Sequence, residues 1–127
     1  MLWLLTQTVN EMPEFRTALT ENGLGYYDEM HPAYTIFNQE QKTFSGIWTA
    51  YKSNYAAFLS SYEADVARYS SSKEYAPKPE RPANSFDVSM IPWFSFTAFN
   101  LQVFGDGNYL LPIFTMGKVF DAGSKKM

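Results

Sequence analysis

The sequence contains no cysteine and only one histidine among its 127 residues. Without cysteine there is no disulfide bond, no thiolate nucleophile and no cysteine-bound metal ion. One histidine cannot build a nitrogen-ligand zinc site, and the acidic residues lack the spacing of a calcium loop. We therefore expect no metal site, and a chain without thiols fits the reducing cytoplasm.

An excess of basic residues and a long apolar run are also missing. Ten Lys and Arg residues stand against 13 Asp and Glu residues, which gives a net charge of −3. Nucleic acids bind basic patches, so no nucleic-acid partner is expected. The apolar start Met1-Leu2-Trp3-Leu4-Leu5 is too short for a transmembrane span and lacks the basic residues of a signal peptide. No membrane partner is expected either.

Apolar residues are abundant, at 46% of the chain, and aromatic residues make up 18%. This composition and length predict one packed domain over residues 1–127. Leu2, Leu5, Val9 and Met12 recur at helical spacing, and Pro13 ends that predicted helix. No capping residue precedes it, so we expect the domain to be incomplete at this end.

A longer apolar stripe follows two β-rich stretches at residues 24–27 and 34–37, which we interpret as strands. The stripe predicts a helix over residues 45–70 that packs on a sheet, and a cofactor groove along it is the less common alternative. Its other side carries Lys52, Ser53, Glu63 and Asp65, which indicates a solvated face. The members of the stripe are Phe44, Ile47, Trp48, Tyr51, Tyr55, Phe58, Leu59, Tyr62, Val66 and Tyr69.

The last third of the chain alternates loops with β-type patterns. Three prolines predict a polar loop over residues 77–82, and residues 86–90 alternate as a strand. An apolar stretch over 94–103 and a turn at 105–108 precede a predicted buried strand over 109–120. A hairpin turn at 121–124 lacks its returning strand, so we expect incompleteness at this end as well. The order of elements favours an α/β layered fold.

Few residues point to chemistry by themselves. His31 precedes Pro32 in a predicted loop without the partners of a catalytic triad, so we interpret it as a loop residue. Gly105-Asp106-Gly107 is a tight turn, because it lacks the third glycine and the following helix of a dinucleotide site. The lysines near the end of the chain indicate a solvated edge or a contact to a phosphate-bearing ligand.

The order of several short motifs carries more information. These motifs are Pro13-Glu14-Phe15-Arg16, His31-Pro32-Ala33-Tyr34-Thr35-Ile36-Phe37, Thr43-Phe44-Ser45, Ser89-Met90-Ile91-Pro92-Trp93, Phe96-Thr97-Ala98-Phe99-Asn100-Leu101 and Pro112-Ile113-Phe114-Thr115-Met116-Gly117-Lys118. In these motifs the chain resembles the chloramphenicol acetyltransferase family over nearly its whole length. This resemblance implies a two-layer α/β sandwich with a mixed β-sheet, incomplete at both ends, and a homotrimer with active sites between subunits.

The resemblance also implies an activity and a set of site residues. Family members transfer acetyl from acetyl-CoA, a co-substrate rather than a bound cofactor, to a hydroxyl, typically of chloramphenicol. Ser89 matches the serine that stabilises the tetrahedral oxyanion, and Thr115 matches a threonine that positions a water. Trp93 and Lys118 match positions on the coenzyme side. The acceptor pocket corresponds to Phe44, Phe99, Leu101, Val103 and Ile113.

The chain departs from the family pattern in two places. The motif His-His-x-x-x-Asp-Gly, whose histidine is the general base, is absent, and we expect it shortly past Met127. Residues 75–86 match poorly, which leaves the acceptor open. The chain by itself is therefore expected to be inactive. Two alternatives remain: acetylation of another hydroxyl compound, or a non-catalytic binding or assembly module.

Overall fold

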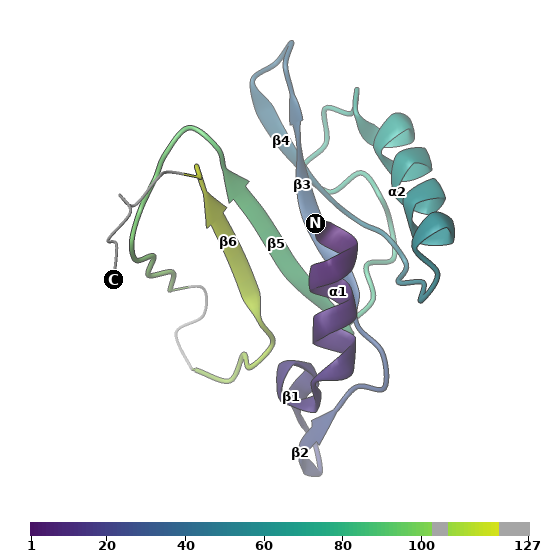
Figure 1. Ribbon diagram of the computed structural model, residues 1–127, viewed down its shortest axis with the longest axis vertical. Helices are drawn as coiled ribbons and strands as arrows, with labels where there is room; N and C mark the ends of the chain where they lie inside the picture. Colours follow the sequence, from purple (N-terminus) through teal and green to yellow (C-terminus); the bar gives the residue numbers. More distant parts are fainter. Residues whose placement is uncertain (103–106, 120–127) are drawn as a thin grey trace, which may run out of the picture.

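The structure is a computed structural model that describes residues 1–102 and 107–119. Two α-helices, one short 3₁₀ helix and six strands follow one another along these residues (Figure 1). Their bounds are α1 (Leu2–Glu11), η1 (Pro13–Arg16), β1 (Thr17–Thr20), β2 (Gly23–Tyr26), β3 (His31–Asn38), β4 (Thr43–Trp48), α2 (Tyr55–Tyr69), β5 (Ser85–Ile91) and β6 (Ile113–Gly117). Neither α-helix has the length and hydropathy that a transmembrane helix needs, within the described ranges.

Four strands form a mixed sheet in the order β4-β3-β5-β6. β4 runs antiparallel to β3, whereas β5 is parallel to β3 and β6 is parallel to β5. The remaining two strands, β1 and β2, form a separate hairpin at one end of the molecule (Figure 1). The expected mixed sheet with helices packed on it is confirmed.

The core lies between the two helices and one face of this sheet. Phe86 and Val88 of β5 pack there with Tyr34 of β3, Ile47 of β4 and Val9 of α1. Because side chains alternate along a strand, the residues between these point to the opposite face. The paired registers place Phe44, Asp87, Ser89, Ile113 and Thr115 on that opposite face. We call it the helix-free face, since no helix of the described residues packs on it.

The helix predicted over residues 45–70 is wrong in its first third. Residues up to Trp48 belong to β4, which pairs with β3 along its whole length, and α2 begins only at Tyr55. Asn54 caps α2, because its Oδ1 accepts the backbone N–H of Ala57 at 3.0 Å. Asp65, assigned to a solvated face, instead turns inward, with its side chain only 18% exposed.

Some of the other predicted secondary-structure elements agree with the structure and others do not. The N-terminal helix, the loop over 77–82 and the strand over 86–90 are confirmed, whereas β1 was missed. The two early strands correspond to β2 and β3, and β3 already begins at His31. The buried strand over 109–120 is wrong in extent, because β6 covers five residues and is only half-buried. Residues 103–106 and 120–127, with the turn at 121–124 and part of that at 105–108, lie outside the described residues.

The proline-containing loop between α2 and β5 covers the outer edge of β4. The backbone N–H of Gly46 donates to the carbonyl of Tyr75 at 2.7 Å, and Ser45 Oγ donates to the carbonyl of Glu74 at 2.6 Å. Lys78 Nζ donates to the carbonyl of Trp48 at 2.8 Å. The first and third of these bonds occupy backbone groups of β4 that an exposed edge strand would offer to another strand.

Candidate functional site

Two hydroxyl side chains meet on the helix-free face. Ser89 of β5 and Thr115 of β6 are direct partners in the parallel register of these strands. Their oxygens lie 3.1 Å apart, at hydrogen-bonding distance, and both residues are half-buried. The structure therefore brings together the two residues that the sequence predicts as catalytic. When Thr115 donates to Ser89, the Ser89 hydroxyl keeps its own hydrogen for a developing negative charge.

A pocket of about 400 Å³ lies next to this pair. Its floor is β6, through Ile113 and Thr115, and its wall is the segment that follows β5, through Phe99, Asn100 and Leu101. Three of the residues predicted to bind the acetyl acceptor, Phe99, Leu101 and Ile113, therefore line one cavity. Thr115, predicted to be catalytic, lines the same cavity. The apolar side chains of Phe99, Leu101 and Ile113 line it together with polar groups, and small-molecule sites combine both kinds of lining.

Phe44, also predicted for the acceptor pocket, does not line this cavity. Its ring lies between those of Phe37 and Trp93, with centroids 5.1 Å and 6.1 Å away. Trp93, predicted on the coenzyme side, is 65% exposed. These rings form a second, solvent-exposed aromatic cluster, separate from the pocket wall.

The last two predicted residues contribute less to this geometry. Lys118 follows β6 directly, has an exposed side chain, and donates its backbone N–H to the carbonyl of Phe94 at 2.7 Å. Val103 lies outside the described residues. Lys118 is thus fixed through its backbone to the segment that forms the pocket wall.

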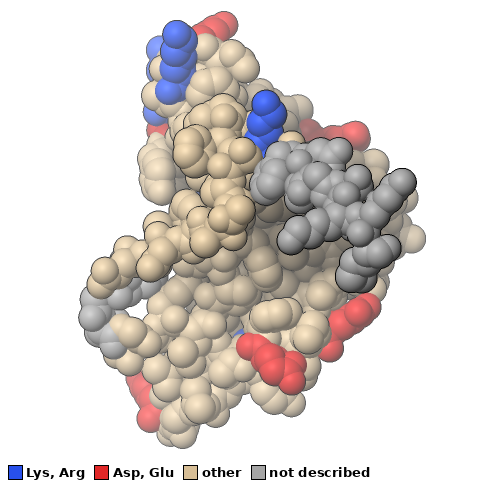
Figure 2. Space-filling view, turned by 60° about the vertical axis from the view of Figure 1, so that its left-hand side comes forward, with Lys and Arg blue, Asp and Glu red and all other residues tan. Residues whose placement is uncertain are grey.

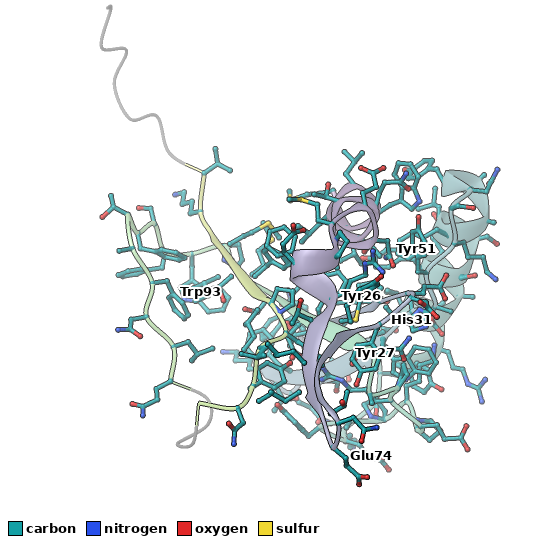
Figure 3. All side chains as sticks on the ribbon, turned by 90° about the horizontal axis from the view of Figure 1, so that it is seen from below. Tyr26, Tyr27, His31, Tyr51, Glu74 and Trp93 are labelled. Atoms are coloured by element: carbon teal, nitrogen blue, oxygen red, sulfur yellow. The ribbon has the colours of Figure 1, made fainter. Side chains whose placement is uncertain are left out.

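His31 is not close to this site. Figure 3 shows it beside Tyr51, well separated from Trp93. It begins strand β3 and does not lie in a loop, which corrects the assignment from sequence. Its Nδ1 accepts the backbone N–H of Tyr51 at 2.9 Å, and its side chain is 15% exposed. The bond requires an unprotonated Nδ1, so His31 has a structural role here.

This environment makes the stability depend on pH. Burial lowers the pKa of His31, and the Glu29 carboxylate, 3.7 Å from Nε2, opposes that effect only in part. The unfolded chain therefore takes up the proton first as the pH falls below about 6.5, and stability is lost in that range. We expect the free energy of unfolding in urea to fall between pH 7.5 and pH 5.5.

A His31→Asn variant is the matched control, because asparagine keeps an acceptor oxygen near the position of Nδ1 but does not titrate. Its free energy of unfolding should change less over the same interval. Equal pH dependence in both proteins would contradict the assignment to His31.

One charged side chain on the helix-free face was not predicted from the sequence. Asp87 forms an ion pair with Arg81 at 3.0 Å and accepts a hydrogen bond from the Tyr109 hydroxyl at 3.3 Å. Burial and the charge of Asp87 raise the pKa of Tyr109. The alternation of residues 86–90 already places Asp87 on the same side as Ser89, so this pattern could have identified it.

Charged side chains are few on the described surface of the side that carries β6. Figure 2 brings the β6 side of the molecule forward, and its described surface is mostly neither acidic nor basic. Within residues 1–102 and 107–119, no three histidine or carboxylate side chains gather into a possible metal site. The hydroxyls of Ser89 and Thr115 are the polar groups of this face that lie next to the pocket and can hydrogen-bond a molecule bound there.

Comparison with known proteins gives consistent matches. A family model described as chloramphenicol acetyltransferase matches residues 1–127. Chloramphenicol acetyltransferase from Clostridium perfringens is 44% identical over 98% of this chain and 58% of its own length. That from Clostridioides difficile is 48% identical over 98% of this chain and 59% of its own.

A solved structure with the same description has a TM-score of 0.76, and covers 96% of this chain and 60% of that one at 18% identity. This likeness supports the α/β fold with its mixed sheet. The chain spans about three fifths of the length of the curated relatives it matches.

Proposed function

Because the chain belongs to the chloramphenicol acetyltransferase family, we propose that the whole protein transfers acetyl from acetyl-CoA to a hydroxyl of chloramphenicol. The observation that carries this proposal is the pair Ser89–Thr115, at 3.1 Å, next to a pocket that Phe99, Leu101 and Ile113 line. An acetyl acceptor in this pocket lies beside two hydroxyls, one of which can donate outward while the other donates within the pair. The aromatic and aliphatic wall suits the nitrophenyl group of chloramphenicol.

In the proposed reaction the acceptor hydroxyl attacks the thioester carbonyl of acetyl-CoA. A general base removes the hydroxyl proton, and the carbonyl oxygen becomes a tetrahedral oxyanion. Ser89 donates a hydrogen bond to this oxyanion, while Thr115 positions a water beside it. Collapse of the intermediate expels the coenzyme A thiolate, which takes the proton back from the base.

We propose that the general base is a histidine outside these 127 residues. His31 is unsuited to this role, because Tyr51 N–H occupies its Nδ1 and it lies away from the site. The relatives are longer than this chain, which leaves room for a base in a histidine motif of the family.

The proposal also covers the contacts to the two substrates, the oligomeric state and the cellular compartment. The exposed Trp93 and Lys118 are proposed to contact coenzyme A, and Phe44 to contact the acceptor in the assembled protein. A homotrimer in the cytoplasm is proposed as the working form. The family membership and the cysteine-free sequence support this form.

The test is an activity assay on the protein expressed from the complete reading frame that contains these residues. With acetyl-CoA and chloramphenicol, we expect release of coenzyme A and formation of acetylated chloramphenicol. Activity on other alcohols but not on chloramphenicol would overturn the substrate and keep the transferase. No activity with any hydroxyl acceptor, from a folded protein, would overturn the proposed function.

A further inference from the structure

The segment that forms the pocket wall lies against β6 at Gly117. A Cβ atom at this position would lie 2.7 Å from Cε1 of the Phe96 ring and 2.9 Å from the carbonyl oxygen of Phe94. Carbon atoms in folded proteins do not approach so closely, so any larger residue here displaces the wall segment. The backbone of Gly117 has no positive φ, and its lack of a side chain alone permits this contact.

Two aromatic rings connect Gly117 to the pocket. The Phe96 ring packs on that of Phe99, with centroids 5.4 Å apart, and Phe99 lines the pocket with Thr115. Next to Gly117, the backbone N–H of Lys118 donates a hydrogen bond to the carbonyl oxygen of Phe94 at 2.7 Å. Gly117 therefore lies where the segment after β5, which lines one side of the pocket, contacts strand β6, which lines the other side.

We propose that Gly117 is a specificity-determining positioning residue, whose missing side chain sets the distance between the Phe96–Phe99 wall and β6 and thereby the width of the acceptor pocket. The inference rests on the proposed function for the identity of the acceptor. According to this inference, the pocket prefers an acceptor whose flat ring fits between Phe99 and Ile113. A residue with a Cβ atom widens the pocket and favours a bulkier acceptor.

The first test is a Gly117→Ala variant of the complete protein, assayed by steady-state kinetics. We expect the KM for chloramphenicol to rise about tenfold, because a small displacement of the wall misplaces the bound ring. The KM for acetyl-CoA and the kcat should change less than the KM for the acceptor. Relative kcat/KM should shift toward chloramphenicol analogues with a larger ring substituent. An acceptor KM within about twofold of the original overturns the proposal.

Gly46→Ala is the matched control. Gly46 lies in β4 of the same sheet, and a Cβ atom there would meet only the carbonyl of Tyr75 at an ordinary 3.7 Å. We expect unchanged kinetic constants in this variant. A similar rise in the acceptor KM would show that glycine replacement in the sheet acts nonspecifically, which overturns the proposal.

A double-mutant cycle with Phe96→Leu tests the route from Gly117 to the pocket. If Gly117 acts through the Phe96 ring, the two changes together raise the acceptor KM less than the product of their separate effects. Effects that simply multiply overturn this route.

A crystal structure of Gly117→Ala provides a readout that needs no activity. We expect residues 94–101 to lie farther from β6 than in the unaltered protein, and an unmoved segment overturns the proposal. If the unaltered protein acetylates no acceptor, the proposed function fails, and this displacement still decides whether Gly117 positions the wall.

Discussion

Replacing Ser89 with alanine is expected to lower the kcat of acetyl transfer by about 100- to 1,000-fold. In the proposed mechanism its hydroxyl contacts the charge that develops only in the transition state. Removal of such a contact lowers kcat while the KM for each substrate stays nearly constant. The short distance to Thr115, 3.1 Å, means that the Ser89 oxygen is already held in place before the reaction begins.

Steady-state kinetics of the complete protein measures this effect, with acetyl-CoA and chloramphenicol varied in turn. Ser60→Ala is the matched control, because Ser60 is exposed on α2 and should leave all kinetic constants unchanged. A kcat for Ser89→Ala within a factor of two or so of the original protein would remove Ser89 from the proposed mechanism.

Local periodicity was sufficient for some elements and misleading for others. The N-terminal helix and β5 were predicted because their apolar residues follow one period and packing agrees with it. Phe44, Ile47 and Trp48 fit helical spacing equally well, yet they lie in β4. Pairing with β3 decided their conformation, and such pairing between separate segments leaves no local period to detect.

The site illustrates the same limit. The family motifs singled out Ser89 and Thr115, and their roles remain predictions. Their contact depends on the parallel register of β5 and β6, which a sequence does not specify by itself. Likewise, Gly117 is one of seven glycines in the chain, and only the path of the wall segment across β6 distinguishes it. The contacts of these residues follow from the long-range arrangement of the chain, which residue type alone does not reveal.

A half-buried charge pair gives the largest expected effect on stability. Asp65 of α2 accepts hydrogen bonds from Lys78 Nζ and from Thr49 Oγ1, each at 2.8 Å. The Lys78 ammonium also lies 4.2 Å from the Trp48 ring centroid. The side chains of Lys78 and Asp65 are 16% and 18% exposed, so water screens their attraction only weakly. This pair joins the helix layer to the loop that covers the β4 edge.

Asp65→Ala is therefore expected to lower the free energy of unfolding by about 3 kcal/mol, because it leaves the half-buried ammonium of Lys78 without a counter-charge. Urea unfolding of the complete protein measures the change. Glu63→Ala, on the exposed side of the same helix, should change stability by less than about 0.5 kcal/mol.

The double variant Asp65→Ala/Lys78→Met separates the cost of an unpaired charge from the value of the pair itself. When both charges are removed, no charge remains buried without a partner, and the methionine side chain still packs on Trp48. We expect the double variant to regain more than half of the stability that Asp65→Ala loses. If the double variant is less stable than Asp65→Ala, the stabilisation comes from the hydrogen bonds of Lys78 to the Trp48 carbonyl and not from the charge pair.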